Sequence, residues 1–215
     1  MKLRAWVRYV RKALETWGLI AREYGWRESF MSKRPVDAQG QAIPWYTYPA
    51  IEFLRSLDLR GRRVFEFGCG NSSVFWAGRA QEVVAVENDI EWARTVNAYG
   101  IANLTVMEQP DMDLYVLAPD HAGGVFDVVV IDGRRRHACI PASLRVVSAT
   151  GMVIFDNADW YPDACADLRA QGWFQIDFSG LGPINPYCWT TSVFVRCSAD
   201  FARAANVKPV GGNPQ

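Results

Sequence analysis

Short apolar runs that alternate with helix-like stretches constrain the fold of this chain more than any other feature of its sequence. From residue 63 onward, such runs recur, and helical segments separate most of them. Strands that alternate with helices in this way predict a parallel sheet with helices on both faces. The expected strands are residues 63–67, 82–87, 104–108, 125–131, 151–155, 173–178 and 192–196.

The last two expected strands have no helical segment between them. We therefore expect them to form an antiparallel pair, joined by the loop at residues 179–190. Residues 3–24 carry apolar side chains at helical spacing. The predicted fold class is α/β: a seven-stranded, mostly parallel sheet with helices on both faces, an antiparallel final hairpin and an N-terminal helix. The helices between the strands are expected at residues 73–80, 90–99, 140–147 and 162–171.

The length and composition of the chain suit one packed domain with short appendages. It has 215 residues, of which 50% are hydrophobic, and this is enough to bury a sizeable core. We expect an N-terminal helical cap and loop at residues 1–43, one large domain at 44–200 and a C-terminal tail at 201–215.

Charge and cysteine content argue against several classes of protein. Lys and Arg total 23 and so do Asp and Glu, and this balance argues against a general nucleic-acid-binding surface. The five cysteines form no CxxC pair, as expected for reduced thiols. No apolar run reaches the ~20 residues of a membrane span. We therefore expect a cytoplasmic protein with no nucleic-acid partner.

Basic and aromatic residues in the expected N-terminal helix leave two interpretations open. The first is a helix that lies on a membrane surface, with tryptophans at the interface, which would make the protein membrane-peripheral. The second is a cap helix that packs on the domain and keeps its basic face in water. The residues concerned are Lys2, Arg4, Arg8, Arg11 and Lys12, with Trp6 and Trp17.

Polar residues stand where each expected parallel strand ends. In an open parallel sheet, ligands bind beyond the carboxyl ends of the strands. The first strand runs into Glu66-Phe67-Gly68-Cys69-Gly70, and glycines there let a ligand approach the backbone. We expect one ligand site along this edge of the sheet. The residues at the later strand ends are Glu87, Glu108-Gln109, Asp132 and Asp156-Asn157.

The glutamate before the glycines discriminates between two nucleotide classes. A dinucleotide fingerprint has a third glycine near its pyrophosphate cradle, and here Ser73 stands in that place. Glu66 would also repel a pyrophosphate, whereas it suits a ligand with a positive group. A protein that binds a cationic nucleoside ligand is therefore favoured. The alternatives are an NAD(P)-dependent Rossmann oxidoreductase and a non-catalytic nucleotide-binding protein of the same fold.

The pattern Glu66-x-Gly68-x-Gly70 closely resembles motif I of the class I S-adenosylmethionine-dependent methyltransferases, and Glu87 resembles their motif II acid. Together with the final hairpin, the resemblance covers about residues 44–196, so the large domain at 44–200 would be the methyltransferase domain. It implies S-adenosylmethionine as cofactor, with the ribose at Glu87. The other cofactor-binding residues that it implies are Glu66, Gly68, Gly70 and Ser72 at the methionine part, Glu108 or Gln109 near the adenine, Asn88, and Asp132.

Asp132, Asp156 and Asn157 also look like the metal triad of the catechol and caffeoyl-CoA type O-methyltransferases, which would hold Mg²⁺ or another divalent metal. Those enzymes carry a lysine three residues after the first aspartate, and here Arg135 stands in that place. A divalent metal is therefore the less favoured reading. The resemblance to small bacterial O-methyltransferases instead implies a side-chain base, and the catalytic candidates are Asp156, His137 and Asp132.

Aromatic and polar residues near the strand ends are the candidates for contact with the methyl acceptor. The expected acceptor is a hydroxyl group of a small molecule, a glycan or a lipid-linked precursor. Amino-directed DNA methyltransferases place Asp or Asn before Pro-Pro-aromatic, and this chain has Asp132-Gly133 there. The substrate candidates are Trp45, Tyr46, Arg135, Asn157 and Trp160, within an aromatic set that includes Tyr48, Tyr161, Tyr187 and Trp189.

Overall fold

One mixed sheet organises the molecule. The computed structural model describes residues 2–205 and 207–212, and within them seven strands pair in the order β3-β2-β1-β4-β5-β7-β6. β1 to β5 run parallel, whereas β7 lies antiparallel to both β5 and β6. The predicted fold class is confirmed. The strands are β1 (Arg63–Phe67), β2 (Glu82–Glu87), β3 (Leu104–Glu108), β4 (Phe126–Ile131), β5 (Val147–Phe155), β6 (Phe174–Gly180) and β7 (Trp189–Val195).

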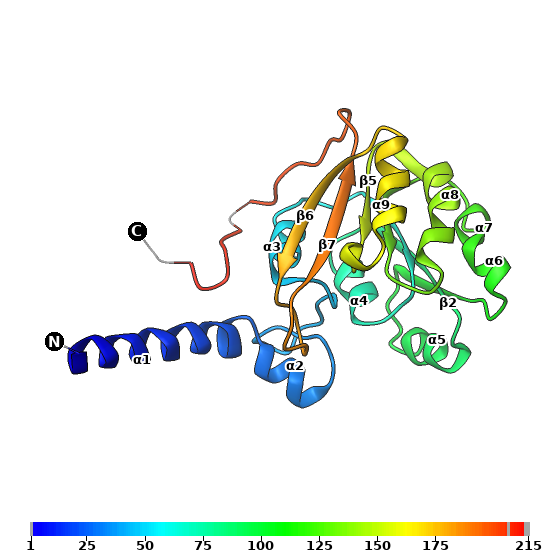
Figure 1. Ribbon diagram of the computed structural model, residues 1–215. Coiled ribbons are helices and arrows are strands. Elements are labelled where there is room, and N and C mark those ends of the chain that lie inside the picture. The colour runs from blue at the N-terminus through cyan, green and yellow to red at the C-terminus, as the bar shows by residue number, and fades with distance from the viewer. Residues whose placement is uncertain (1, 206, 213–215) are drawn as a thin grey trace.

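Helices cover both faces of the sheet (Figure 1). α3 (Tyr48–Arg55), α4 (Asn71–Ala77) and α5 (Ile90–Asn97) pack on one face. The opposite face is covered by α6 (Met112–Val116), α7 (Ala118–His121), α8 (Arg136–Val146) and α9 (Pro162–Ala170). The sequence did not predict α6 and α7, because helices of five and four residues are too short to show a 3.6-residue period.

The alternation of side chains along each strand separates the core into two layers. In β1, Phe65 and Phe67 are fully buried and pack with the helices of the α6–α9 face, while Val64 packs on the α3–α4 face. Each fully buried phenylalanine contributes roughly 1.5–3 kcal/mol through the hydrophobic effect. Because both faces are covered, the parallel strands read as continuous apolar runs, and this explains why their bounds are visible in the sequence.

The five parallel strands end at the same edge of the sheet. Phe67 at the end of β1 pairs in register with Val86 of β2 and Ile131 of β4, and Ile131 pairs with Phe155 of β5. β2 and β4 flank β1 on opposite sides, so the strand order reverses direction at β1. A crevice opens beyond the strand ends at such a point.

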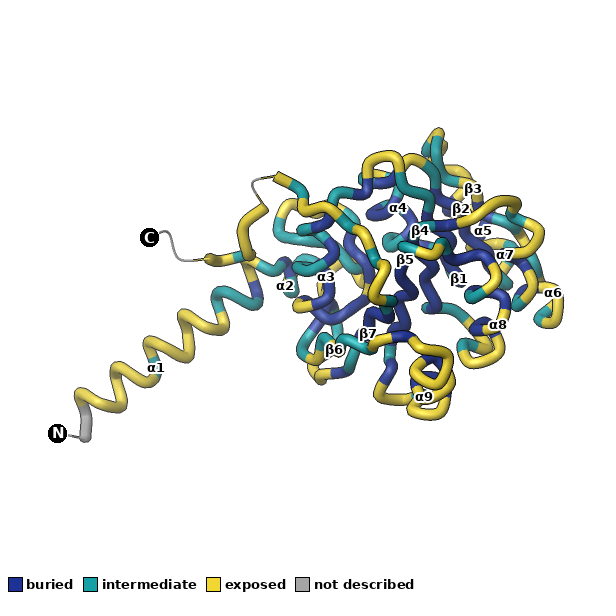
Figure 2. Tube along the Cα trace, turned by 90° about the horizontal axis from the view of Figure 1, so that it is seen from above, coloured by how far each residue is buried: buried dark blue, intermediate teal, exposed yellow. Residues whose placement is uncertain are grey.

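Helix α1 (Lys2–Gly18) projects from this body (Figure 2). A turn of π-helix (Leu19–Glu23) and α2 (Trp26–Ser32) follow it, and α2 contacts the domain, where the Trp26 indole N–H donates to the Asn185 carbonyl at 3.3 Å. The interpretation of this helix as a cap that packs on the domain is wrong for α1, because Trp6 and Leu14 remain 62% and 64% exposed. No helix among residues 2–205 and 207–212 is long and apolar enough to cross a membrane.

The segment after β7 is held by backbone hydrogen bonds. Leu57 and Arg203 form an isolated antiparallel bridge, and the Ala204 N–H donates to the Ser56 carbonyl at 2.8 Å. The first residues of the predicted tail therefore attach to the end of α3, because they satisfy backbone groups there. The division of the chain at residues 43 and 200 stays a prediction.

Candidate active site

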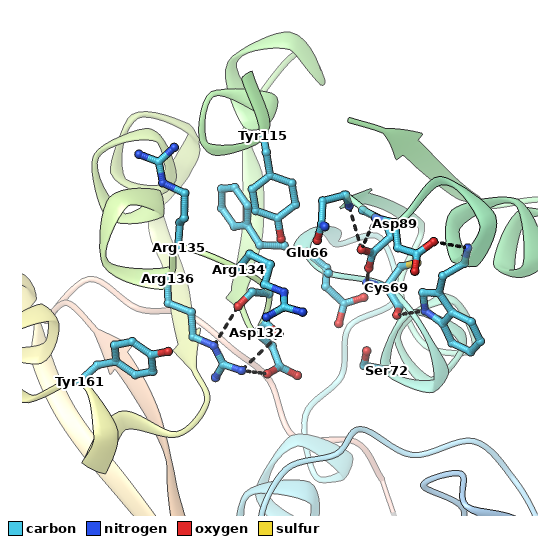
Figure 3. Close-up of a pocket in the computed structure, with 16 residues that line it drawn as sticks. Glu66, Cys69, Ser72, Asp89, Tyr115, Asp132, Arg134, Arg135, Arg136 and Tyr161 are labelled. Atoms are coloured by element: carbon cyan, nitrogen blue, oxygen red, sulfur yellow. Dashed lines mark hydrogen bonds and ion pairs between the residues drawn. The ribbon is translucent and has the colours of Figure 1, made fainter. Parts of the chain in front are cut away.

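A cleft of about 640 Å³ lies beyond the carboxyl ends of β1, β2 and β4, and we call it the strand-end cleft (Figure 3). The residues that line it include Glu66, Gly68, Ser72, Glu87, Asn88, Asp132 and Arg135, all predicted from the sequence, together with Cys69, Trp92, Tyr115, Arg136 and Tyr161.

Two glycines keep the floor of the strand-end cleft free of side chains. Gly68 has a φ of +92°, a left-handed conformation that favours glycine. A Cβ at Gly133 would stand 2.9 Å from the Gly68 nitrogen and would collide with the Tyr115 hydroxyl. The loops after β1 and β4 therefore approach each other closely, and a ligand can reach their backbone.

Glu66 is a buried carboxyl group with one unpaired oxygen. Its side chain is 1% exposed, and its Oε2 accepts a short hydrogen bond from the Ser73 hydroxyl at the start of α4. Its Oε1 is buried without a hydrogen-bond partner among the described residues. Burial raises the pKa of Glu66 to about 8. A positively charged ligand group in the cleft would both pair with Oε1 and restore the carboxylate.

Glu87, at the end of β2, holds the loop that follows β1. Its Oε1 accepts from the Asn88 and Asp89 N–H groups at 2.8 and 2.9 Å, and its Oε2 accepts from the Cys69 N–H at 3.2 Å. The Trp92 indole N–H donates to the Cys69 carbonyl at 2.8 Å from the other side. The carboxylate is thus fixed in place with its charge at the cleft wall. Trp92 was not predicted, because nothing in the sequence ties it to Cys69.

Arg136, the first residue of α8, joins three of the predicted site residues. Its guanidinium lies 2.8 Å from Asp132 Oδ1 and donates to Asn157 Oδ1 at 2.8 Å, and Asp156 Oδ2 is 3.8 Å away. Arg135, just before the helix, has a φ of +50°, and its guanidinium pairs with Asp113 at 2.6 Å. Figure 3 shows Arg136 turned toward Asp132, whereas Arg135 points away from it.

The position of Arg136 bears on the metal site considered above. Asp132, Asp156 and Asn157 do come together, as a divalent metal triad requires, but the Arg136 guanidinium lies between them. A fixed cation at this point would repel a metal ion. No group of three or more His, Cys, Asp or Glu side chains among residues 2–205 and 207–212 has the geometry to hold one. The residues present do not fit a divalent metal.

Asp156 is the more deeply buried carboxyl group of the pair. Its side chain is 3% exposed, against 20% for Asp132. Its Oδ1 accepts hydrogen bonds from Thr191 Oγ1 at 2.5 Å and Trp189 Nε1 at 3.1 Å, both from β7. Burial, followed by the nearby Asp132 charge, raises the pKa of Asp156 well above its ordinary value. Oδ2 is left to face Arg136, so this oxygen is the one available to a ligand.

A second cavity, of about 290 Å³, opens beside Asp156, and we call it the aromatic hollow. Asp132 and Arg136 line both cavities, so the strand-end cleft and the aromatic hollow meet at this ion pair. Segments far apart in the sequence build the hollow's wall. The other lining residues are Trp45, Asp156, Asn157, Trp160, Asn185, Tyr187 and Trp189.

Neither Tyr46 nor His137, both predicted as site residues, lines either cavity. Tyr46 is fully buried in the core beneath the site, so it has no surface for an acceptor, and its hydroxyl has no partner among the described residues. His137 follows Arg136 in α8 and points outward, where its Nε2 lies 2.6 Å from Asp167 of α9. Successive helical residues diverge by about 100°, so an inward Arg136 places His137 outside. These positions remove Tyr46 from the acceptor contacts and His137 from the catalytic candidates.

Three of the predicted cofactor residues do not line the strand-end cleft. Glu108 pairs with Arg94 at 3.2 Å, and the Gln109 side chain accepts from the Asp111 N–H at 3.2 Å. Gly70 lies against Trp92, whose ring would be 3.6 Å from a Cβ there. Contact of Glu108 or Gln109 with an adenine stays a prediction.

No family model matches the chain, and no curated protein matches it. Solved structures do match it. One is a precorrin-6y C5,15-methyltransferase from Geobacter metallireducens, with 14% identity and a TM-score of 0.55 over 69% of this chain and 87% of that one. An rRNA methylase from Streptococcus thermophilus matches with 17% identity and a TM-score of 0.52, covering 69% of this chain and 96% of that one.

The O-methyltransferase TomG from Streptomyces achromogenes, solved in complex with SAM, also matches, with 17% identity and a TM-score of 0.51 over 69% of this chain and 78% of that one. The chain shares the fold of these methyltransferases. At such identities the likeness is one of fold, and the matching proteins methylate acceptors as different as a precorrin and an rRNA. The acceptor of this chain therefore has to be argued from its own site.

Proposed function

We propose that this protein is an S-adenosylmethionine-dependent methyltransferase that methylates a hydroxyl group of a small molecule, a glycan or a lipid-linked precursor. The observation that carries the proposal is the meeting of two cavities at Asp132 and Arg136. One cavity has the features that a cationic nucleoside ligand needs, and the other holds a buried carboxyl group beside aromatic rings. Transfer between two ligands requires such a junction.

The residues of the strand-end cleft fit the proposed cofactor. The unpaired oxygen of Glu66 would hold its ammonium group, Gly68 and Gly133 leave room for its backbone contacts, and Glu87 offers a fixed carboxylate for ribose hydroxyls. When bound, this cofactor supplies an electrophilic methyl group on a sulfonium centre. A buried glutamate at Glu66 disfavours the pyrophosphate that an NAD(P)-dependent enzyme would place there.

Asp156 is the proposed general base. A carboxylate whose pKa is raised toward neutrality accepts a proton from a hydroxyl group better than an ordinary one. Thr191 and Trp189 hold Oδ1, so Oδ2 is the oxygen that takes the proton. The loss of that proton increases the nucleophilicity of the acceptor oxygen, and no metal-bound hydroxyl is needed.

Arg136 is the proposed positioning residue. It binds Asp132, Asn157 and the Asp156 carbonyl at once, and it is only 13% exposed. Its positive charge opposes the rise that burial causes in the pKa of Asp132 and of Asp156. Trp45, Trp160 and Tyr187 line the hollow, and aromatic rings of this kind stack on sugar or aryl faces.

The test has two steps that separate binding from catalysis. Isothermal titration with S-adenosylhomocysteine and, separately, with NAD⁺ should show binding of the first ligand alone. Transfer of a labelled methyl group to hydroxyl acceptors, including sugars and lipid-linked glycans, should then identify the substrate class. Binding of NAD⁺ in place of S-adenosylhomocysteine would refute the proposal, and cofactor binding without transfer to any acceptor would favour a non-catalytic protein.

A further inference from the structure

The projecting helix α1 carries an apolar face that the other described residues leave largely exposed. Five apolar residues of α1 follow the three- and four-residue spacing of a single helix face: Trp6, Val7, Val10, Leu14 and Trp17. Trp6 is 62%, Leu14 64% and Trp17 54% exposed. Figure 2 shows α1 as a rod that stands away from the body of the protein. Contiguous exposed apolar surface of this kind marks an interaction site.

The opposite face of α1 is basic. Arg4, Arg8, Arg11 and Lys12 are exposed on it. The one acidic residue within α1, Glu15, lies 3.5 Å from Arg11 and 3.4 Å from Lys12. The helix thus combines aromatic and aliphatic side chains on one side with excess positive charge on the other, which is typical of helices that lie in the surface plane of an anionic bilayer.

The apolar face continues from α1 onto α2. The Trp17 ring packs edge-on against Trp26 with centroids 5.5 Å apart, and Trp26 stacks on Phe30 at 5.2 Å. Phe30 and Met31 are exposed beside them. The two helices therefore present one apolar surface, which we call the α1–α2 face.

We propose that the α1–α2 face docks on an anionic lipid bilayer, with α1 lying in the plane of the membrane surface. A helix of 17 residues is about 25 Å long, which allows contact with the membrane surface along its whole length. A second copy of α1 is the other occupant to consider. Two α1 helices would bring their excess positive charges together, and 17 residues fall short of the three to four heptads expected of a coiled coil.

Docking would place the aromatic hollow near the membrane. The Trp26 indole N–H donates to the Asn185 carbonyl at 3.3 Å, and Asn185 and Tyr187 line that hollow. Among the proposed acceptors, this arrangement favours the lipid-linked precursor. That refinement rests on the proposed function, whereas the docking itself depends on neither cofactor nor acceptor.

Vesicle flotation of the full chain tests the docking. The probes are vesicles of phosphatidylcholine alone and of phosphatidylcholine with an equal share of phosphatidylglycerol. We expect binding to the anionic vesicles alone, and binding that weakens as salt is added. Arg4→Gln with Arg8→Gln should lower the partition coefficient about 30-fold, since each basic residue near the surface contributes about fivefold.

Trp6→Ala with Leu14→Ala should lower the partition coefficient at least about tenfold, because the buried apolar area is lost. Phe174→Ala, which removes an aromatic side chain 67% exposed on β6, is the matched control and should leave partitioning unchanged. S-adenosylhomocysteine affinity, measured on every variant, reports on the proposed function separately.

Equal partitioning of the wild type and the α1 variants, or no binding to anionic vesicles, would overturn the proposal. A dimer in sedimentation velocity that Trp6→Ala with Leu14→Ala dissociates would overturn it too, because a second copy would then cover the face. Circular dichroism and thermal melting confirm that each variant is folded.

Discussion

Glu66 should release a proton when the cofactor site fills. With a pKa of about 8, its carboxyl group is about 90% protonated at pH 7 in the free protein. An ammonium group beside Oε1 would favour the carboxylate and expel that proton. The amino group of the ligand, with an ordinary pKa of about 8, is mostly charged already at pH 7 and takes up little. We expect a net release of about 0.8 proton per bound S-adenosylhomocysteine.

The matching perturbation is Glu66→Gln, which keeps the shape of the side chain and can still accept from Ser73. Titration calorimetry at pH 7, repeated in buffers of different ionisation enthalpy, measures the protons released. The wild type should show the release and Glu66→Gln should not. As the pH is raised toward 8, the affinity of the wild type for S-adenosylhomocysteine should increase by up to about tenfold per pH unit. The affinity of the variant should not show this dependence on pH. A release that is the same in both proteins would refute the assignment of Glu66 to a cationic ligand group.

The same carboxyl group should lower the stability of the free protein as the pH rises. Its folded-state pKa of about 8 exceeds the value of 4.5 expected in the unfolded chain, so between these values the folded state binds more protons. The free energy of unfolding therefore decreases through this window, by at most about 5 kcal/mol from this group. Glu66→Gln should melt at a higher temperature than the wild type at pH 8, and close to it at pH 5.

Further variants test the other parts of the site. Glu87→Gln should weaken S-adenosylhomocysteine binding by about 1.5–3 kcal/mol in calorimetry, as expected for a lost charge-assisted hydrogen bond, and unchanged affinity would contradict its ribose assignment. Asp156→Asn should lower kcat by about 10²–10⁴-fold with cofactor affinity retained; His137→Ala is the control and should keep its activity. Arg136→Ala should lower the free energy of unfolding, measured in urea, by about 3–5 kcal/mol, because it leaves buried carboxyl groups without their cation. Turnover should survive EDTA and gain nothing from Mg²⁺, and a Mg²⁺ requirement would overturn the role given to Arg136.

The strand pattern of this chain could be predicted because burial on both faces leaves a local signature. The bounds of β1, β2 and β3 agree with the prediction, and β4 differs by one residue. β7 begins at Trp189, inside the predicted loop at 179–190, because its first residues pair with β6 over a long register that no local pattern reveals. The sequence of α1 shows that the helix is amphipathic. Whether the domain packs against its apolar face depends on the rest of the fold, and the residues of α1 alone do not reveal it.

The acidic strand ends follow from the sequence alone: Glu66, Glu87, Asp132 and Asp156 each stand at or just beside the end of a parallel strand, and such ends must share one edge of the sheet. Which neighbours reach them was decided by the tertiary structure. Arg135 adopts a left-handed conformation just before α8, Arg136 then turns inward and His137 outward, and three distant segments bring Trp45, Trp160 and Tyr187 around one hollow. The physical reason is that strand periodicity is a local property of the chain, whereas the direction of a side chain at a helix start and the meeting of loops depend on packing across the whole fold.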